Sequence, residues 1–157
     1  MKNLTNENYI TAAVNTYSDT VFRVAFQYVK NRADAEDVLQ EVFLTLYKKT
    51  PQFSVDDDGL KAWLIRVTIN KSKDFLRANK RRRAFMQNYQ PTTQINPYDE
   101  VFEALDKLSE LDRNAIYLHY YEGYTAKEIA QILGGNERAI TKRIERARKK
   151  LKVFLGE

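Results

Sequence analysis

Apolar residues recur at helical spacing along most of the chain, and short polar segments separate one run from the next. The first run covers residues 7–30, after a polar start over residues 1–8 that we expect to be irregular. The second follows Asp34, which can cap a helix, and ends with Lys49. The third covers residues 60–83, and we expect its buried face to contain Leu60, Trp63, Leu64, Val67 and Phe75, with a second buried edge of Ile65, Ile69 and Leu76.

The periodicity stops at residues 84–98, which hold two prolines together with Gln, Asn and Thr. It resumes in an acidic helix over residues 99–108 and in a second helix that Ser109 can cap. Pro and Gly are few in the whole chain, which also favours helices. We therefore predict an all-α protein with two small helical domains, residues 1–83 and 99–157, joined by a flexible linker.

Residues 122–151 have the pattern of two helices joined by a tight turn. Thr125 and Glu128 have the spacing of a capping box, and Gly134 and Gly135 interrupt the helix that follows. Asn136 can then cap a second, basic helix, whose inward stripe is Ile140, Ile144, Ala147 and Leu151. This pattern is typical of a helix-turn-helix, whose second helix enters the DNA major groove. The alternative is an αα-hairpin with a solvated basic face.

The net charge of +5 conceals two basic regions on an otherwise acidic chain. Residues 61–83 contain nine Lys or Arg and one Asp, and residues 137–152 contain eight Lys or Arg and two Glu. Two concentrated basic regions suggest two contacts with nucleic acid, although helices also carry basic faces that only meet water. The first region ends in a basic block at residues 80–83. Before this block, one side of the helix carries a polar stripe of Arg66, Asn70, Lys73 and Arg77.

Several functional classes are excluded or disfavoured by the composition. The chain has no cysteine and one histidine, His119, so disulfides and thiolate or histidine-rich metal sites are excluded. No catalytic triad, phosphate-binding glycine loop or metal spacing is present, and we expect neither catalysis nor a cofactor. His119 is expected in the core or at its boundary rather than in a catalytic role. The chain has no signal peptide and no run long enough to span a membrane, so we expect a cytoplasmic protein without membrane insertion.

The polar face of the second helix has two interpretations on the residues alone. Asp37, Gln40, Glu41 and Thr45 lie opposite its apolar stripe. They form either an ordinary solvated surface, which the residues favour, or a docking face for a basic or mixed partner.

Three motifs follow each other along the chain: DAEDVLQEVFLTLYKK, LKAWLIRVTINKSKDFLRANKRR and LSELDRNAIYLHYYEGYTAKEIAQILGGNERAITKRIERARKKL. In this order and spacing they resemble a bacterial RNA polymerase sigma factor of the extracytoplasmic-function (ECF) group, over about residues 9–155. The resemblance implies a non-catalytic subunit that binds core RNA polymerase, recognises two promoter elements and promotes transcription initiation and strand opening. It also implies an anti-sigma factor as a further partner.

The resemblance also implies roles for particular residues. The second helix would dock on the clamp helices of the polymerase β′ subunit through Asp34, Asp37, Gln40, Glu41 and Thr45. The third would face the minus-ten element and help to open it through Arg66, Asn70, Lys73, Asp74, Arg77, Lys80 and Arg81. The last would bind the minus-thirty-five element through Arg138, Thr141, Lys142, Arg143, Arg146 and Lys149.

The predicted turn and the last helix depart from the usual family pattern. Gly135 replaces an apolar residue, Arg138 and Ala139 replace a Gly-Thr pair, and Lys142 replaces a serine.

Two alternatives to a sigma factor follow from the residues. One is a stand-alone helix-turn-helix regulator that acts without core polymerase, and the other is a helical adaptor whose basic faces bind acidic proteins.

Overall fold

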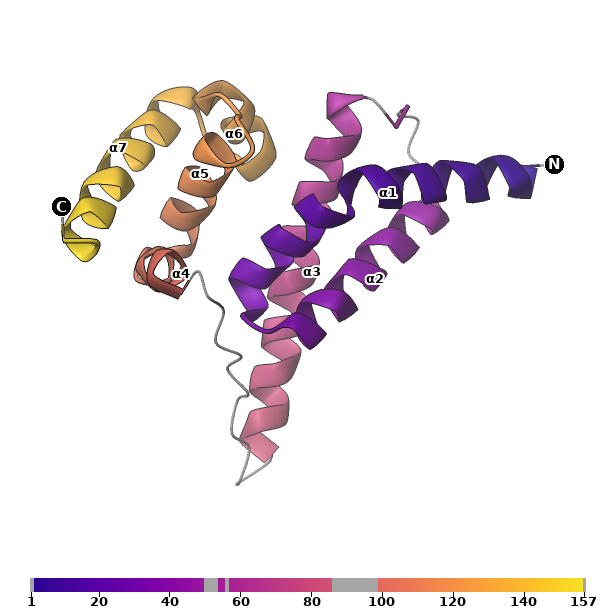
Figure 1. Cartoon of the computed structure of the whole chain (residues 1–157), viewed down its shortest axis with the longest axis horizontal. Coiled ribbons are helices and arrows are strands. Elements are labelled where there is room, and N and C mark those ends of the chain that lie inside the picture. The colour runs from indigo at the N-terminus through magenta and orange to yellow at the C-terminus, as the bar shows by residue number, and fades with distance from the viewer. Residues whose placement is uncertain (1, 50–53, 56, 86–98, 157) are drawn as a thin grey trace. The chain divides into compact units, whose positions relative to one another are not determined.

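The computed structural model describes residues 2–49, 54–55, 57–85 and 99–156, and every regular element within them is an α-helix. The chain divides into two compact units, Met1–Gln94 and Ile95–Glu157. The predicted all-α class is confirmed (Figure 1). The predicted linker, residues 84–98, lies outside the described residues except for Ala84 and Phe85, which are helical.

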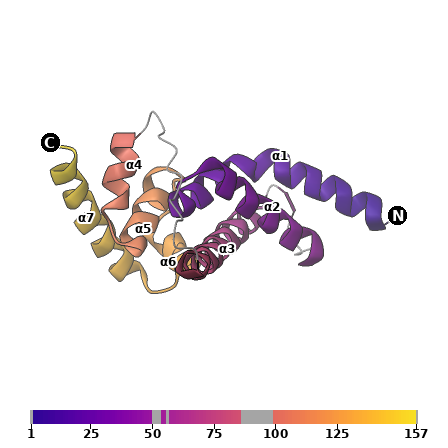
Figure 2. The ribbon, with the colours of Figure 1, turned by 90° about the horizontal axis from the view of Figure 1, so that it is seen from below.

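The first unit is a packed group of three helices: α1 (Lys2–Val29), α2 (Arg32–Lys49) and α3 (Asp58–Phe85). Each helix contacts the other two, and Figures 1 and 2 show α1 and α2 lying against α3. Each contributes small or branched apolar side chains to the core, because its apolar stripe faces its neighbours. This core includes Val21, Val24 and Ala25 of α1, Val38, Val42 and Leu46 of α2, and Leu60, Leu64 and Ile65 of α3.

Two helix boundaries in this unit differ from the prediction. The first helix begins at Lys2 rather than near Glu7, because residues 2–29 contain no proline or glycine to interrupt it. The cap of α2 is Asn31 rather than Asp34, since the Asn31 Oδ1 accepts a hydrogen bond of 2.8 Å from the Asp34 backbone N–H. The Asp34 carboxylate in turn accepts a hydrogen bond from the Asn31 amide. A positive φ of 62° at Lys30 reverses the chain just before this cap.

The buried face of α3 also differs from the prediction. Leu60 and Leu64 are buried as expected, but Trp63 and Val67 are only half-buried. Thr68 and Ser72 are completely buried in their place, and the Thr68 hydroxyl donates to the Leu64 carbonyl oxygen. Hydrophobicity alone assigns small hydroxyl residues to the outside, although a threonine that bonds to its own helix is readily buried.

The second unit contains α4 (Asp99–Asp106), α5 (Glu110–Tyr120), α6 (Ala126–Leu133) and α7 (Glu137–Phe154). Helices α5 and α6 both pack on α7 and on each other, and α4 contacts α7. The Ser109 hydroxyl caps α5 as predicted, by accepting from the Asp112 N–H. The core contains side chains of all four helices and Leu108 of the α4–α5 connection. The helical residues are Leu105, Ala115, Ile116, Leu118, Ile129, Ile132, Ile140, Ile144 and Ala147.

Candidate nucleic-acid interface

The turn between α6 and α7 has the capped geometry that the sequence predicts. The Thr125 hydroxyl accepts from the Glu128 N–H, and the Glu128 carboxylate accepts from the Thr125 N–H. Gly134 and Gly135 both have positive φ angles, 89° and 99°, so the chain leaves α6 in a conformation that side chains disfavour. The Asn136 Oδ1 then accepts from the Ala139 N–H at 2.8 Å and caps α7. These residues build a helix-turn-helix.

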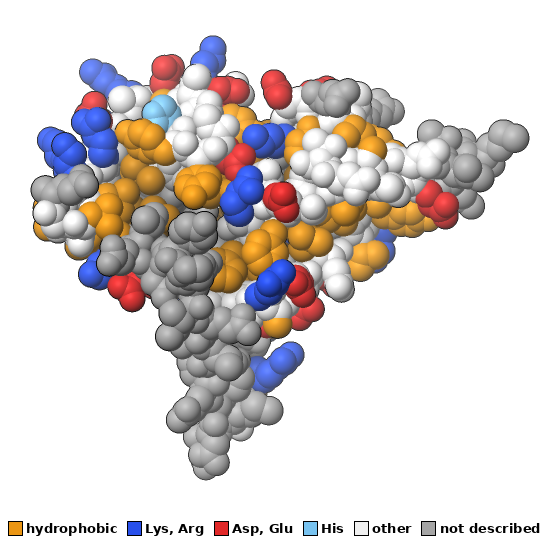
Figure 3. Space-filling view, in the orientation of Figure 1, with side chains coloured by type: hydrophobic (Ala, Val, Ile, Leu, Met, Phe, Trp, Pro, Cys, Tyr) orange, Lys and Arg blue, Asp and Glu red, His pale blue; other side chains and the backbone are white. Residues whose placement is uncertain are grey.

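The basic residues of α7 lie on two different sides of the helix. Ile140, Ile144 and Ala147 are buried against α5 and α6, which turns Arg138, Lys142 and Lys149 outward. The Thr141 side chain is exposed too, but its hydroxyl donates to the Glu137 carbonyl oxygen. Figure 3 shows Lys and Arg side chains gathered over α7. An exposed row of cations along one helix suits a polyanion.

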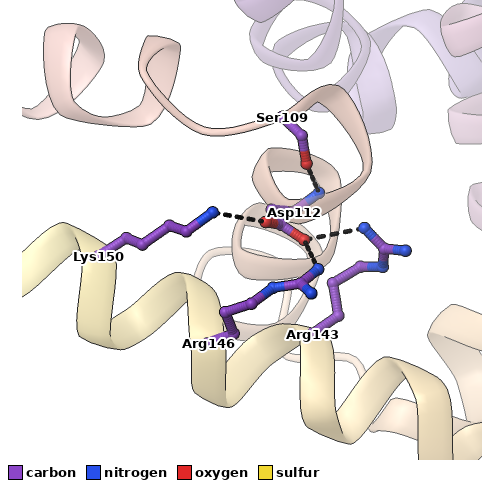
Figure 4. Close-up of polar contacts among 5 residues, drawn as sticks. All are labelled: Ser109, Asp112, Arg143, Arg146 and Lys150. Atoms are coloured by element: carbon purple, nitrogen blue, oxygen red, sulfur yellow. Dashed lines mark hydrogen bonds and ion pairs between the residues drawn. The ribbon is translucent and has the colours of Figure 1, made fainter.

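The other side of α7 is tied to α5 by one carboxylate. Asp112, only 1% exposed, accepts hydrogen bonds from Arg143 at 2.9 Å and Arg146 at 3.1 Å, both on the same oxygen. The Lys150 ammonium lies 3.9 Å from the second oxygen (Figure 4). Arg143 and Arg146, both predicted to contact DNA, are therefore held by the protein itself. The sequence showed Asp112 only as an acidic residue at a helix start, and its partners Arg143 and Arg146 lie 31 and 34 residues further along the chain.

The charge of Asp112 is maintained by these partners. Burial acts to raise the pKa of the carboxyl, but hydrogen bonds and charges from Arg146 and Arg143 act in the opposite direction. The net result is a pKa below the ordinary value of an aspartate. Asp112 is thus ionised at neutral pH, and α7 presents its remaining positive charges on the outer side.

The polar stripe predicted on α3 is on the outside of the first unit. Arg66, Asn70, Arg77, Lys80 and Arg81 are exposed, and Lys73 is half-buried. Asp74 lies beside this stripe and forms an ion pair of 2.6 Å with Arg77. The stripe is opposite the buried face of α3, so the helix presents it to a partner without rearrangement.

Three of the five predicted docking residues of α2, Asp37, Gln40 and Glu41, border a groove shared with α3. Asp37, Gln40 and Glu41 are exposed, whereas Asp34 and Thr45 are half-buried and bond within or next to the helix. The groove has a volume of about 490 Å³ and is lined by Asp37, Val38, Gln40, Glu41, Lys71, Asp74 and Phe75. Lys71 and Phe75 were missed as site residues, because only the packing of α3 against α2 brings them to this groove. Asp74, predicted to face DNA, lies here as well.

Other kinds of site find no support in the part of the chain that the structure describes. His119 is half-buried, and its Nδ1 lies 2.8 Å from the Tyr124 carbonyl oxygen, which gives the side chain a structural place beside the α5–α6 turn. No group of three His, Cys, Asp or Glu side chains is arranged to hold a metal ion within those same ranges. Among the described helices, none is long and apolar enough to cross a membrane.

Comparison with known proteins assigns both units. The family model for Sigma-70 region 2 matches residues 13–82, and that for Sigma-70, region 4 matches residues 98–151. The ECF RNA polymerase sigma factor SigM of Mycobacterium tuberculosis is 30% identical over 139 residues, which cover 85% of this chain and 70% of that protein. The chain belongs to the ECF group of RNA polymerase sigma factors.

Further relatives of this sigma factor agree. SigV of Bacillus subtilis is 26% identical over 159 residues and covers 98% of this chain and 95% of its own length. The solved structure of CnrH in complex with the cytosolic domain of CnrY matches with a TM-score of 0.71 and 26% identity, over 96% of this chain and 89% of that one. This sigma factor therefore promotes transcription initiation by RNA polymerase, and it is not an enzyme.

Proposed function

We propose that this sigma factor recognises its promoter through two separate helices, α7 of region 4 and α3 of region 2. The observation that carries the proposal is the pair of outward basic stripes, each on a different compact unit. The outer face of α7 enters the major groove of the minus-thirty-five element, with Arg138 and Lys142 closest to the bases and Lys149 closer to phosphate. Thr141 also lies on this exposed part of α7.

On α3, Asn70 and Arg77 meet the minus-ten element, where Asn pairs with base edges and Arg with phosphates. The basic residues Arg66, Lys73, Lys80 and Arg81 attract the same strands. Strand opening requires bases to leave the stack, which costs a few kcal/mol, and contacts with the released strand offset that cost.

Docking on core polymerase takes place at the groove between α2 and α3. Asp37 and Glu41 give its α2 side a negative charge, and the half-buried Phe75 gives it apolar surface. A helix with basic and apolar side chains suits such a groove, and we propose that the clamp helices of the β′ subunit occupy it. Transcription takes place in the bacterial cytoplasm, which we propose as the site of action.

An anti-sigma factor is proposed as a second protein partner. The support is that CnrH, 26% identical to this chain, was solved in complex with CnrY. A protein that qualifies must compete with core polymerase for the purified chain and reduce its transcription. A binding protein that leaves core binding unchanged would argue against this role.

Reconstitution with core polymerase and run-off transcription from candidate promoters tests the proposal. Arg138→Ala and Lys142→Ala should weaken binding to the upstream element by roughly five-fold or more each, because each removes a groove contact, while affinity for core stays unchanged. A chain that binds promoter DNA equally well without core polymerase would support a stand-alone regulator instead. Loss of core binding in these α7 variants would contradict the assigned surfaces.

A further inference from the structure

Asp112 lies beneath α7, the proposed DNA-binding helix, and is not part of the outer surface of that helix. It belongs to α5, is buried, and accepts bonds from two arginines of α7 (Figure 4). The Ser109 hydroxyl binds the Asp112 backbone N–H, which fixes the place of the carboxylate at the start of α5. The carboxylate is thus a fixed hydrogen-bond acceptor for two arginines, whose long side chains are otherwise flexible.

The two arginines are only partly covered by this contact. Their side chains remain 28% exposed in Arg143 and 57% exposed in Arg146, so part of each side chain still reaches the surface of α7. An arginine guanidinium has five N–H donors, and one or two of them suffice for Asp112. An arginine held on one edge by a carboxylate can present its other edge to a base or phosphate in one orientation.

We infer that Asp112 is a specificity-determining positioning residue, which orients Arg146 and Arg143 toward the upstream promoter element without touching DNA. The inference deepens the proposed function and rests on the proposed role of α7 in the major groove. Asp112 also neutralises charge on this side of α7, which restrains attraction to DNA of any sequence. Both effects favour selectivity over plain affinity.

The test uses the full chain assembled with core polymerase and a library of duplexes randomised across the upstream element. In Asp112→Asn we expect discrimination between the best and second-best base to fall by roughly five-fold or more at the positions nearest Arg146. The affinity for random duplex should rise instead. The slope of log affinity against log salt concentration should steepen by about one, which corresponds to one more released ion. A purely structural role would lower both affinities together.

Asp106→Asn is the matched control, because it removes the same charge from the same unit. Asp106 forms an ion pair of 3.6 Å with Arg113 of α5. This variant should raise affinity for random duplex and keep the base preferences. Asp112→Glu retains the charge and should restore most of the discrimination. A folded Asp112→Asn variant with wild-type base preferences would overturn the inference.

A spectroscopic measurement keeps the test decisive if Asp112→Asn fails to fold. In ¹⁵N NMR spectra of the wild-type chain, rotation of the guanidinium groups of Arg143 and Arg146 should be hindered relative to that of Arg138. Free rotation in both would overturn the inference by itself. Failure of the proposed function is distinguishable, because wild-type holoenzyme would then select no upstream sequence at all, whatever the arginine dynamics.

Discussion

Asp112 shows at the scale of one residue how a buried charge is tolerated. Taking a carboxylate out of water is costly, and the cost is offset only where partners and hydrogen bonds are close. Here Arg143, Arg146 and Lys150 surround it from one helix, and Ser109 fixes its backbone. Region 4 therefore depends on this charge, because an apolar residue in place of Asp112 would leave Arg143 and Arg146 without this acceptor.

This carboxylate predicts a dependence of stability on pH. Because the pKa of Asp112 in the folded state lies below its ordinary value of about 3.9, its contribution is complete above about pH 4 and is lost as the pH falls through the folded-state pKa. Thermal unfolding of the chain, followed through amide signals of α7, should show this loss. Asp112→Asn should unfold with a smaller dependence on pH below 4, and equal slopes in both proteins would contradict the assignment.

Gly134 makes a second prediction at this scale. Its φ of 89° and ψ of 164° lie in a region that is accessible almost only to glycine. Gly134→Ala should destabilise region 4 by about 1–3 kcal/mol through backbone strain, since no atom lies within 4 Å of the added methyl group. Urea unfolding measures the change.

Gly59→Ala is the control for this substitution. Gly59 lies in the first turn of α3, where alanine has the higher helix propensity, so alanine there should leave stability unchanged or raise it slightly. A Gly134→Ala protein as stable as the wild type would show that the turn relaxes to another conformation.

At the scale of elements, local signals predicted the second unit better than the first. The caps at Ser109, Thr125 and Asn136 involve residues three apart, and all three were foreseeable from the sequence. On α3 the burial of the leucines and isoleucines was foreseen, but that of Thr68 and Ser72 was not, because contact with other helices buries these two. The groove residues Lys71 and Phe75 escaped prediction for the same reason, as did the pairing of Asp112 with α7.

The helix α3 predicts separable defects in promoter opening. Asn70→Ala and Arg77→Ala should each slow open-complex formation by roughly ten-fold, because each removes a contact to the opened element, while binding to core polymerase persists. Permanganate reactivity of unpaired thymines measures the opening. Arg82→Ala is the control, since Arg82 is exposed on the same helix but lies outside the stripe. Equal defects in all three variants would reduce the role of α3 to general charge attraction.

At the scale of the whole molecule, the surfaces proposed for promoter contact and polymerase docking are distributed over two units. The groove proposed for docking belongs entirely to the first unit, so its disruption should leave region 4 folded and able to bind DNA. This separation allows each activity to be tested in the full chain.

Charge reversal in the groove provides that test. Asp37→Lys combined with Glu41→Lys should lower affinity for core polymerase by roughly ten-fold or more, because like charges then face a basic partner. Glu36→Lys is the control, since Glu36 is exposed on the same helix, pairs with Arg32 and does not line the groove. Surface plasmon resonance with immobilised core measures the difference. Equal losses in the control and the double variant would place the docking face elsewhere.

The position of Asp74 has a consequence for evolution. Asp74 lines the groove proposed for polymerase docking, and its carboxylate also pairs with Arg77 of the stripe proposed to meet the promoter. A mutation there is exposed to two selections at once, one for competition with other sigma factors over a limited pool of polymerase and one for the choice of genes. Lineages that diversify their promoters are therefore expected to change the ends of α3 and the outer face of α7 sooner than Asp74.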